Sequence, residues 1–243
     1  MEKRILVIFA HPDDESFGPS GTLHHYAKAG TRIHLLTATK GEAGKNALDS
    51  SNELGKIREK ELEQAAKVIG IEKVEFMGYI DKTLQDLERY RPIGKILNYI
   101  KQFKPQIIIS FGPTGISQHP DHIAVHHWVT EAFRRSNYPS KLYYYTLSQG
   151  FFDRRYPEKK VRDGSITTII DVSKYKQIKK KAALCHRSQR ISIEKLFKFA
   201  GGARPIPTRE HFILAKHKLD YQPDTLEDDL FKGLTLKRRG EFN

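Results

Sequence analysis

The first 150 residues alternate short apolar runs with segments of helical periodicity, and this alternation constrains the fold more than any other feature. Apolar, β-branched runs predict strands at residues 4–10, 32–39, 73–76, 106–111 and 142–147. Apolar residues at helical spacing predict helices at residues 20–30, 54–69, 92–103 and 122–135. Repeated β-α-β units imply a Rossmann-like, doubly wound α/β fold, with a mostly parallel sheet and helices on both faces.

The C-terminal third is less regular. A strand is predicted at 167–172, a helix at 174–186 and a further strand at 210–217, and residues 221–243 form a polar tail that we expect to be partly ordered. No internal repeat, low-complexity tract or linker divides the sequence. We therefore expect a single domain over residues 1–243.

Composition narrows the functional classes. The formal charge is +13, but the basic residues are spread along the chain without interleaved aromatics, which favours solvated helix faces over nucleic-acid binding. A single cysteine, Cys185, excludes an intrachain disulfide and a cysteine-based zinc site. No signal peptide or membrane-length apolar run is recognisable, so we expect a soluble cytoplasmic protein without a membrane partner. A homo-oligomer is compatible with the sequence, which does not define the oligomeric state.

Acidic residues and a histidine directly follow the first predicted strand. The sequence there is Ala-His-Pro-Asp-Asp-Glu, with His11, Asp13, Asp14 and Glu15 as polar members. Ligands of doubly wound sheets bind beyond the carboxyl ends of the strands, and crowded carboxylates repel one another unless a cation offsets them. The alternative interpretation is a polar turn in which Asp13 or Asp14 caps the next helix.

A second polar segment follows the predicted strand at 106–111. It contains His119, Asp121 and His122 and leads into a helix. Alone, it is also compatible with a helix start capped by Asp121 and surrounded by surface histidines. Because both segments follow parallel strands, they can converge on one crevice and form a mononuclear metal site of nitrogen and oxygen ligands.

Such a site suits amide hydrolysis. Zinc lowers the pKa of a bound water to about 7 and polarises a carbonyl oxygen. A free carboxylate can take the proton of the water and return it to the leaving amine, while a histidine stabilises the oxyanion. Iron(II) uses similar ligands, so the residues alone admit Zn²⁺ or Fe²⁺.

The two histidine boxes together resemble the paired signatures of the LmbE/PIG-L family of zinc-dependent N-acetylglucosaminide deacetylases. Four further segments agree with the family pattern, and the resemblance extends over roughly residues 4–216. These segments are Thr-Lys-Gly-Glu-Ala-Gly at 39–44, Ile-Arg-Glu-Lys-Glu-Leu at 57–62, Gly-Tyr-Ile-Asp at 78–81 and His-Arg-Ser-Gln at 186–189.

The resemblance implies a role for each candidate residue. It makes His11, Asp14 and His122 the zinc ligands. The residues alone do not decide whether Asp13 or Asp14 is the ligand. It makes Asp13 the general base and proton donor, His119 the oxyanion stabiliser and Asp121 the group that orients a neighbouring histidine. It assigns Arg58 and Asp81 to sugar hydroxyls.

Four other residues keep two interpretations. Glu15 and Glu42 are expected either to touch substrate or to support their loops. His126, one turn after His122, is expected in the core or behind a ligand. His186 could reach the site, depending on how the C-terminal third folds.

The substrate implied by the resemblance is a small N-acetyl sugar. Residues 57–66 and 78–83 are similar to the branch that deacetylates N-acetylglucosaminyl malate for bacillithiol synthesis. Other branches act on the inositol-linked conjugate of mycothiol synthesis, on chitin-derived oligosaccharides or on antibiotic conjugates. Two alternatives stand beside a sugar deacetylase: a metal-dependent hydrolase of another bond, such as a carbamoyl, cysteine-conjugate or phosphate ester bond, and a non-enzymatic metal- or sugar-binding protein with a degenerate site.

Overall fold

The fold is described from a computed structural model of the chain. It describes residues 2–48, 53–148, 163–197, 205–220 and 226–234, together with residues 150, 153 and 222. Among these residues, no helix is both long enough and apolar enough to cross a membrane.

A seven-stranded sheet with the order β3-β2-β1-β4-β5-β7-β6 forms the centre of the molecule. Strands β1 to β5 are parallel, whereas β7 runs antiparallel to both β5 and β6. The strands are β1 (Arg4–Phe9), β2 (Arg32–Thr39), β3 (Lys73–Tyr79), β4 (Ile107–Phe111), β5 (Lys141–Thr146), β6 (Thr168–Asp171) and β7 (Arg209–His217). The predicted α/β fold with a mostly parallel sheet is confirmed.

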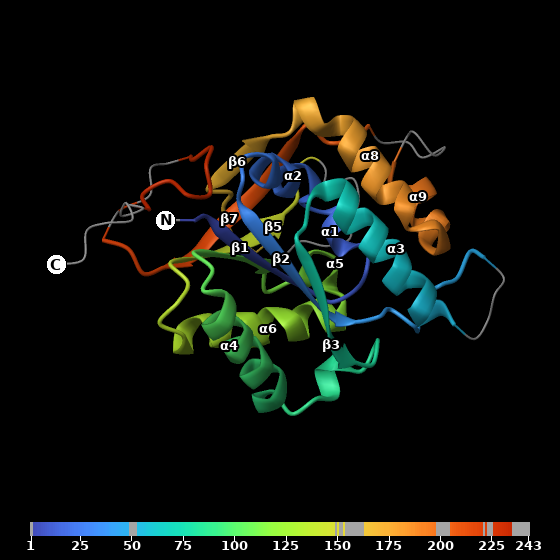
Figure 1. The fold of residues 1–243 in the computed structure, drawn as a ribbon, viewed down its shortest axis with the longest axis horizontal. Coiled ribbons are helices and arrows are strands. Elements are labelled where there is room, and N and C mark those ends of the chain that lie inside the picture. The colour runs from blue at the N-terminus through green and yellow to red at the C-terminus, as the bar shows by residue number, and fades with distance from the viewer. Residues whose placement is uncertain are drawn as a thin grey trace.

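Helices cover both faces of the sheet (Figure 1). Helices α4 and α6 pack together on one face, while α2, α3, α8 and α9 lie on the other. The described helices are α1 (Asp14–Phe17), α2 (Ser20–Lys28), α3 (Leu54–Ile69), α4 (Tyr90–Phe103), α5 (Gly115–Gln118), α6 (Pro120–Arg135), α8 (Lys176–Cys185) and α9 (Arg190–Leu196). Short 3₁₀ turns lie at Leu84–Asp86, Ser173–Tyr175 and Arg187–Gln189.

The central strands are apolar almost without interruption because they are covered on both faces. Residues 5–9 of β1 and all five residues of β4 are buried. If apolar and polar residues alternated along such a strand, the polar side chains would be buried between the sheet and one layer of helices. Burying polar groups costs free energy unless they are paired. The continuous apolar runs therefore identified these strands correctly from sequence.

The structure differs from the prediction at β3, at α6 and in the C-terminal tail for physical reasons. Strand β3 continues beyond residue 76 because Gly78, with φ of 77°, carries it through an irregularity in its pairing with β2. Helix α6 begins at Pro120 rather than His122, since proline suits the first turn of a helix. Within the predicted polar tail, residues 226–234 pack on the core, where Leu230 and Phe231 are buried. The single domain over 1–243 stays a prediction.

Candidate active site

The two histidine-containing segments lie together at the point where the strand order reverses. Strand β1 is flanked by β2 on one side and β4 on the other, so the loops that follow β1 and β4 diverge and leave a crevice between them. Residues 10–15 follow β1 directly, and residues 112–122 follow β4. Topology thus brings together side chains more than 100 positions apart.

Three donor groups from these loops face a common point. His11 Nδ1 lies 3.3 Å from His122 Nε2, and Asp14 approaches these nitrogens at 3.7 Å and 3.4 Å respectively. The three groups satisfy the geometric conditions for a metal-binding cluster. Two ring nitrogens this close are favourable only with a proton or a cation between them, so the arrangement fits a divalent metal.

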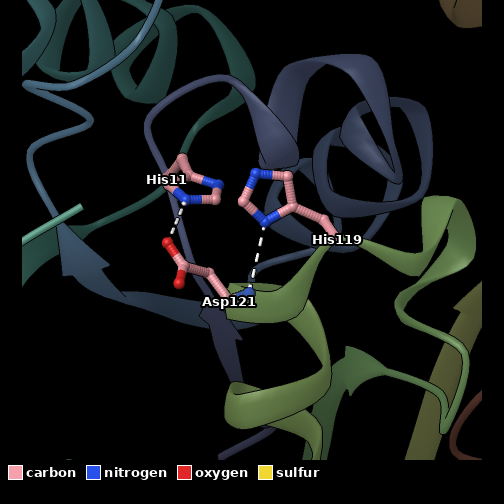
Figure 2. Close-up of side chains that lie close together, drawn as sticks. All are labelled: His11, His119 and Asp121. Carbon is pink, nitrogen blue, oxygen red and sulfur yellow. Dashed lines mark hydrogen bonds and ion pairs between the residues drawn. The ribbon is translucent and has the colours of Figure 1, made fainter. Parts of the chain in front are cut away.

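The far side of the His11 ring is held by two carboxylates. Its Nε2 donates to Asp121 Oδ2 and to Asp81 Oδ1, each at 3.1 Å, which leaves Nδ1 directed to the common point. Figure 2 shows the first of these bonds. Burial lowers the pKa of His11, but the hydrogen bonds to Asp121 and Asp81 and the charge of Asp14 outweigh it and raise the pKa to about 10. The pocket around His11 is therefore built for positive charge.

His122 is oriented in the same manner. Its Nδ1 donates to the carbonyl oxygen of Gly115 at 3.0 Å, and its ring stacks on Phe111 with 4.0 Å between centroids. Burial, together with the neighbouring His11 and His119, holds the pKa of His122 well below its usual range. A neutral ring that donates through Nδ1 keeps a lone pair on Nε2, as a metal ligand requires.

A second cluster, formed by His11, His119 and Asp121, also satisfies the geometric conditions for a metal site (Figure 2). Hydrogen bonds within the protein already occupy both oxygens of Asp121 and one nitrogen each of His11 and His119. Asp121 is fully buried and accepts hydrogen bonds from the backbone N–H groups of Lys82 and Leu84, at 2.8 and 3.2 Å, as well as from His11. His119 Nδ1 accepts the backbone N–H of Asp121 at 3.2 Å. We therefore favour His11, Asp14 and His122 as the ligand set.

Asp13 lies beside this set with its carboxylate held by Arg58. Its Oδ2 is 3.1 Å from Arg58 Nη2, and its side chain is only 14% exposed. Burial raises the pKa of Asp13 to about 7, an effect that the Arg58 charge opposes and the neighbouring Asp14 increases. A carboxylate that gains a proton near neutral pH is suited to general acid–base chemistry.

His119 lines the same cleft as a half-buried, neutral group. Burial and the charge of His11 lower its pKa. Because Nδ1 accepts a backbone hydrogen bond, the ring proton resides on Nε2. His119 therefore caps α6 with one nitrogen and keeps an N–H donor on the other, whereas sequence considerations had offered Asp121 as the cap.

The cleft above these groups has a volume of about 490 Å³. One part of its lining is polar and includes the proposed ligands with Asp13, Asp81 and His119. The remainder is apolar, with three lysines among the lining residues. The apolar residues include Phe17, Ile116, Tyr145, Leu147, Ile191, Phe197 and Pro207, and the lysines are Lys45, Lys82 and Lys195.

The residues expected to bind sugar occupy structural positions as well. Arg58 is buried and donates hydrogen bonds to the carbonyl oxygens of Gly41 and Pro12. These bonds join the loop after β2 to the loop after β1. Asp81 holds His11 and accepts the backbone N–H of Ala43 at 3.1 Å. Glu42 is exposed and accepts the backbone N–H of Asp81 at 3.0 Å. Their contacts with a sugar stay predictions.

Two residues have contacts that sequence considerations did not assign. Glu15 is 1% exposed, and its carboxylate accepts hydrogen bonds from the backbone of Asp13 and from His186, which is fully buried. Both residues lie in motifs that the sequence offered, Glu15 in the first histidine box and His186 in the His-Arg-Ser-Gln segment. Nothing in the sequence indicated that the two side chains contact each other.

His126 donates to the carbonyl oxygen of Phe111 and belongs to the core.

Comparison with known proteins gives one family match and several relatives. Residues 6–133 match the family described as PIG-L, GlcNAc-PI de-N-acetylase. The 1D-myo-inositol 2-acetamido-2-deoxy-alpha-D-glucopyranoside deacetylase of Saccharomonospora viridis is 28% identical over 95% of this chain and 100% of its own length.

Solved structures agree on the fold. The N,N'-diacetylchitobiose deacetylase from Pyrococcus horikoshii superposes with a TM-score of 0.62 at 22% identity, over 87% of this chain and 83% of its own. The 4-carboxy-2-hydroxymuconate hydratase GalB from Pseudomonas putida gives 0.67 at 16% identity, over 90% and 99%. At these identities the likeness concerns the fold alone, which carries different chemistries.

Proposed function

The chain belongs to the PIG-L family of GlcNAc-PI de-N-acetylases and is a hydrolase of amide bonds; we propose that it removes the acetyl group from an N-acetylglucosamine conjugate. The observation that carries this proposal is the convergence of the donor atoms of His11, Asp14 and His122 beside Asp13, a carboxylate outside the proposed ligand set. A degenerate binding protein is disfavoured because the complete set of predicted ligands and the predicted base line one cleft.

The spacing of the three groups fits a tetrahedral metal site. Metal–nitrogen bonds of about 2.0–2.1 Å place neighbouring tetrahedral ligands about 3.3–3.4 Å apart. The observed separations between the donor atoms run from 3.3 to 3.7 Å. Two histidines and one carboxylate are ligands that zinc and iron(II) both accept, and we propose Zn²⁺ as the resident metal with Fe²⁺ as the alternative.

The remaining residues divide the proton and charge transfers. A divalent cation held by His11, Asp14 and His122 would polarise the acetyl carbonyl and make a water molecule more acidic. Asp13 takes the proton of the attacking water, because its carboxylate lies beside the proposed ligands, and returns that proton to the sugar amine when the C–N bond breaks. His119 Nε2–H donates to the oxygen that becomes negative. Arg58 keeps the Asp13 carboxylate directed into the cleft.

We propose the inositol-linked conjugate as the first substrate to test, ahead of the malate conjugate that the sequence motifs suggested. The relative from Saccharomonospora viridis, which this chain matches along its whole length, is named for the inositol compound. The malate conjugate remains a second candidate because Lys45, Lys82 and Lys195 line the cleft and favour an anionic partner of the sugar.

An acetate-release screen on the metal-loaded protein tests the proposal. The panel contains the inositol and malate conjugates of N-acetylglucosamine, diacetylchitobiose and free N-acetylglucosamine, with an N-acetyl cysteine conjugate as a non-sugar amide. We expect release from at least one sugar conjugate and little from the cysteine conjugate. If the metal-loaded protein releases acetate from none of the sugars in the panel, the proposal is overturned.

A further inference from the structure

The backbone of Asp13 adopts a conformation that an aspartate rarely takes. Its φ is 112° and its ψ is −24°, at the junction of β1 and α1. Side chains with a Cβ are strained at positive φ, so neighbouring contacts must hold the residue in place. Such strain often accumulates at functional sites, and here it falls on the residue proposed as the general base.

Glu15 holds the strained residue from the backbone side. One carboxylate oxygen of Glu15 accepts the N–H of Asp13 at 3.0 Å. The other oxygen accepts hydrogen bonds from His186 Nε2 at 2.8 Å and from Ser16 Oγ at 2.5 Å. Because Glu15 and His186 are 1% and 0% exposed, water does not compete for these bonds.

The source of His186 makes this contact more than a local turn. His186 follows α8, 171 positions from Glu15, and α8 packs against both α1 and α3. Its neighbour Ser188 is fixed by two hydrogen bonds to Glu61 of α3, each 2.7 Å long. The C-terminal third thus supplies a rigid support to the loop that carries Asp13.

We propose that Glu15 and His186 are positioning residues that hold Asp13 in its strained conformation, so that its carboxylate faces the metal ligands. This inference rests on the proposed role of Asp13 as general base. Arg58 fixes the carboxylate of Asp13, and Glu15 fixes its backbone amide, so the residue is held at two points. His186 acts only through Glu15 and touches neither substrate nor metal.

Two substitutions separate position from charge. Glu15→Gln keeps an oxygen that can accept the Asp13 N–H, whereas Glu15→Met keeps the length and removes the acceptor. We expect Glu15→Met to lower kcat about 100-fold, the size of effect that a small misplacement of a catalytic group produces, with KM and bound metal little changed. Glu15→Gln should retain activity within about 10-fold of the wild type, and Glu63→Met, the matched control at an exposed position of α3, within about 3-fold.

A cycle with Asp13→Asn tests whether Glu15 acts through Asp13. If it does, Glu15→Met has no further effect on the residual activity of Asp13→Asn, because the group being positioned is already lost. A full additional loss in the double variant, or wild-type activity in Glu15→Met, contradicts the inference. If Asp13→Asn itself is fully active, the role of Asp13 as general base fails instead, and if the wild type releases no acetate from any sugar conjugate, the proposed function fails, so these failures are distinguishable.

A stability measurement covers the case in which Glu15→Met does not fold. Glycine tolerates the backbone conformation of residue 13, so Asp13→Gly removes the strain that Glu15 opposes. The strain counts against the folded state with or without Glu15, so Asp13→Gly should raise the melting temperature of Glu15→Met and let it fold if it fails to fold alone. Loss of Glu15 also lets Asp13 relax, which offsets part of the lost hydrogen bond, so Glu15→Met should lower the melting temperature less in the wild type than in the Asp13→Gly background. An equal loss in the two backgrounds, or failure to fold in both, means that Glu15 merely joins α1 to α8 and contradicts the inference.

Discussion

Asp13 and Asp14 are adjacent carboxylates of the same length, yet the structure gives them different surroundings. Asp14 Oδ2 accepts the backbone N–H of His11 at 2.8 Å, and the same side chain approaches both ligand histidines. Asp13 turns instead toward Arg58. Asp13 precedes helix α1 with a positive φ, whereas Asp14 is the first residue of that helix.

Replacing Asp13 by asparagine should remove the proton acceptor without disturbing the ligands. We expect kcat to fall by a factor of about 10²–10⁴, the usual contribution of general acid–base catalysis, because an amide cannot accept the proton of water. The metal content, measured by atomic spectroscopy, should equal that of the wild type. The exposed Asp86→Asn is the matched control and should behave as wild type. If Asp13→Asn retains wild-type turnover, Asp13 is not the general base.

At the scale of elements, the loop after β4 is shaped around His122. Gly115 has φ of 58°, and a Cβ added there would come within 2.7 Å of the Cβ of His122. Ile116 and Gln118 also adopt positive φ, of 61° and 59°, so the loop is held in an uncommon conformation. Since Gly115 also accepts the hydrogen bond from His122, its backbone sets the ring orientation.

Gly115→Ala should therefore displace His122. We expect metal affinity to drop by a factor of about 10–100, as with other contacts that orient a ligand, and activity to fall with it. Titration with Zn²⁺ against a competing chelator measures the affinity. In Gly94→Ala of α4, where an added Cβ meets nothing within 4 Å, affinity should be unchanged. Equal affinities in the two variants would contradict this view of the loop.

A buried ion pair fixes the start of α2. Glu210 accepts the backbone N–H groups of Gly21 and Thr22, at 3.0 and 2.7 Å, and pairs with Lys179, and both charged side chains are almost fully buried. Glu210→Ala leaves Lys179 without its partner in the interior. The free energy of unfolding should fall by about 3–5 kcal/mol in denaturant titrations. Glu131→Ala, which removes only surface ion pairs with Arg134 and Arg135, should leave the midpoint nearly unchanged, and an equally mild effect of Glu210→Ala would show that the buried pair contributes little.

The sequence predicted the elements better than it predicted the contacts between them. The strands of the parallel sheet were identified because apolar runs covered on both faces leave a local pattern. The convergence of His11 and His122 followed from topology, since both segments follow strands of one parallel sheet. The bond between Glu15 and His186 could not be predicted, because it depends on how α8 packs against α1 and α3, which no local pattern records.

At the scale of the whole molecule, the site joins segments from most of the chain. The proposed ligands come from the loop after β1 and from the first turns of α1 and α6. Arg58 comes from α3, Asp81 from the turn after β3 and His186 from the turn after α8. A metal bound by His11, Asp14 and His122 would therefore stabilise the folded state but not the unfolded chain. Metal binding and global stability should be coupled.

Thermal unfolding in the presence of Zn²⁺ measures that coupling. At a free concentration 100 times its Kd, a ligand specific for the folded state adds about 2.7 kcal/mol of stability. The melting temperature of the wild type should rise accordingly after chelator treatment and readdition of Zn²⁺, while that of His122→Ala should rise much less. His24→Ala, a substitution at a histidine of α2 remote from the cleft, should respond as the wild type does. If Zn²⁺ raises the melting temperature of His122→Ala as much as that of the wild type, the metal binds at another site.

We propose that His11, Asp14 and His122 hold one metal ion. A crystal structure of the zinc-loaded protein, with anomalous data collected at the zinc edge, would show which side chains bind it. We expect one strong peak about 2.0–2.2 Å from His11 Nδ1, His122 Nε2 and a carboxylate oxygen of Asp14. A peak coordinated instead by His119 and Asp121, or the absence of a peak between the two loops, would contradict it.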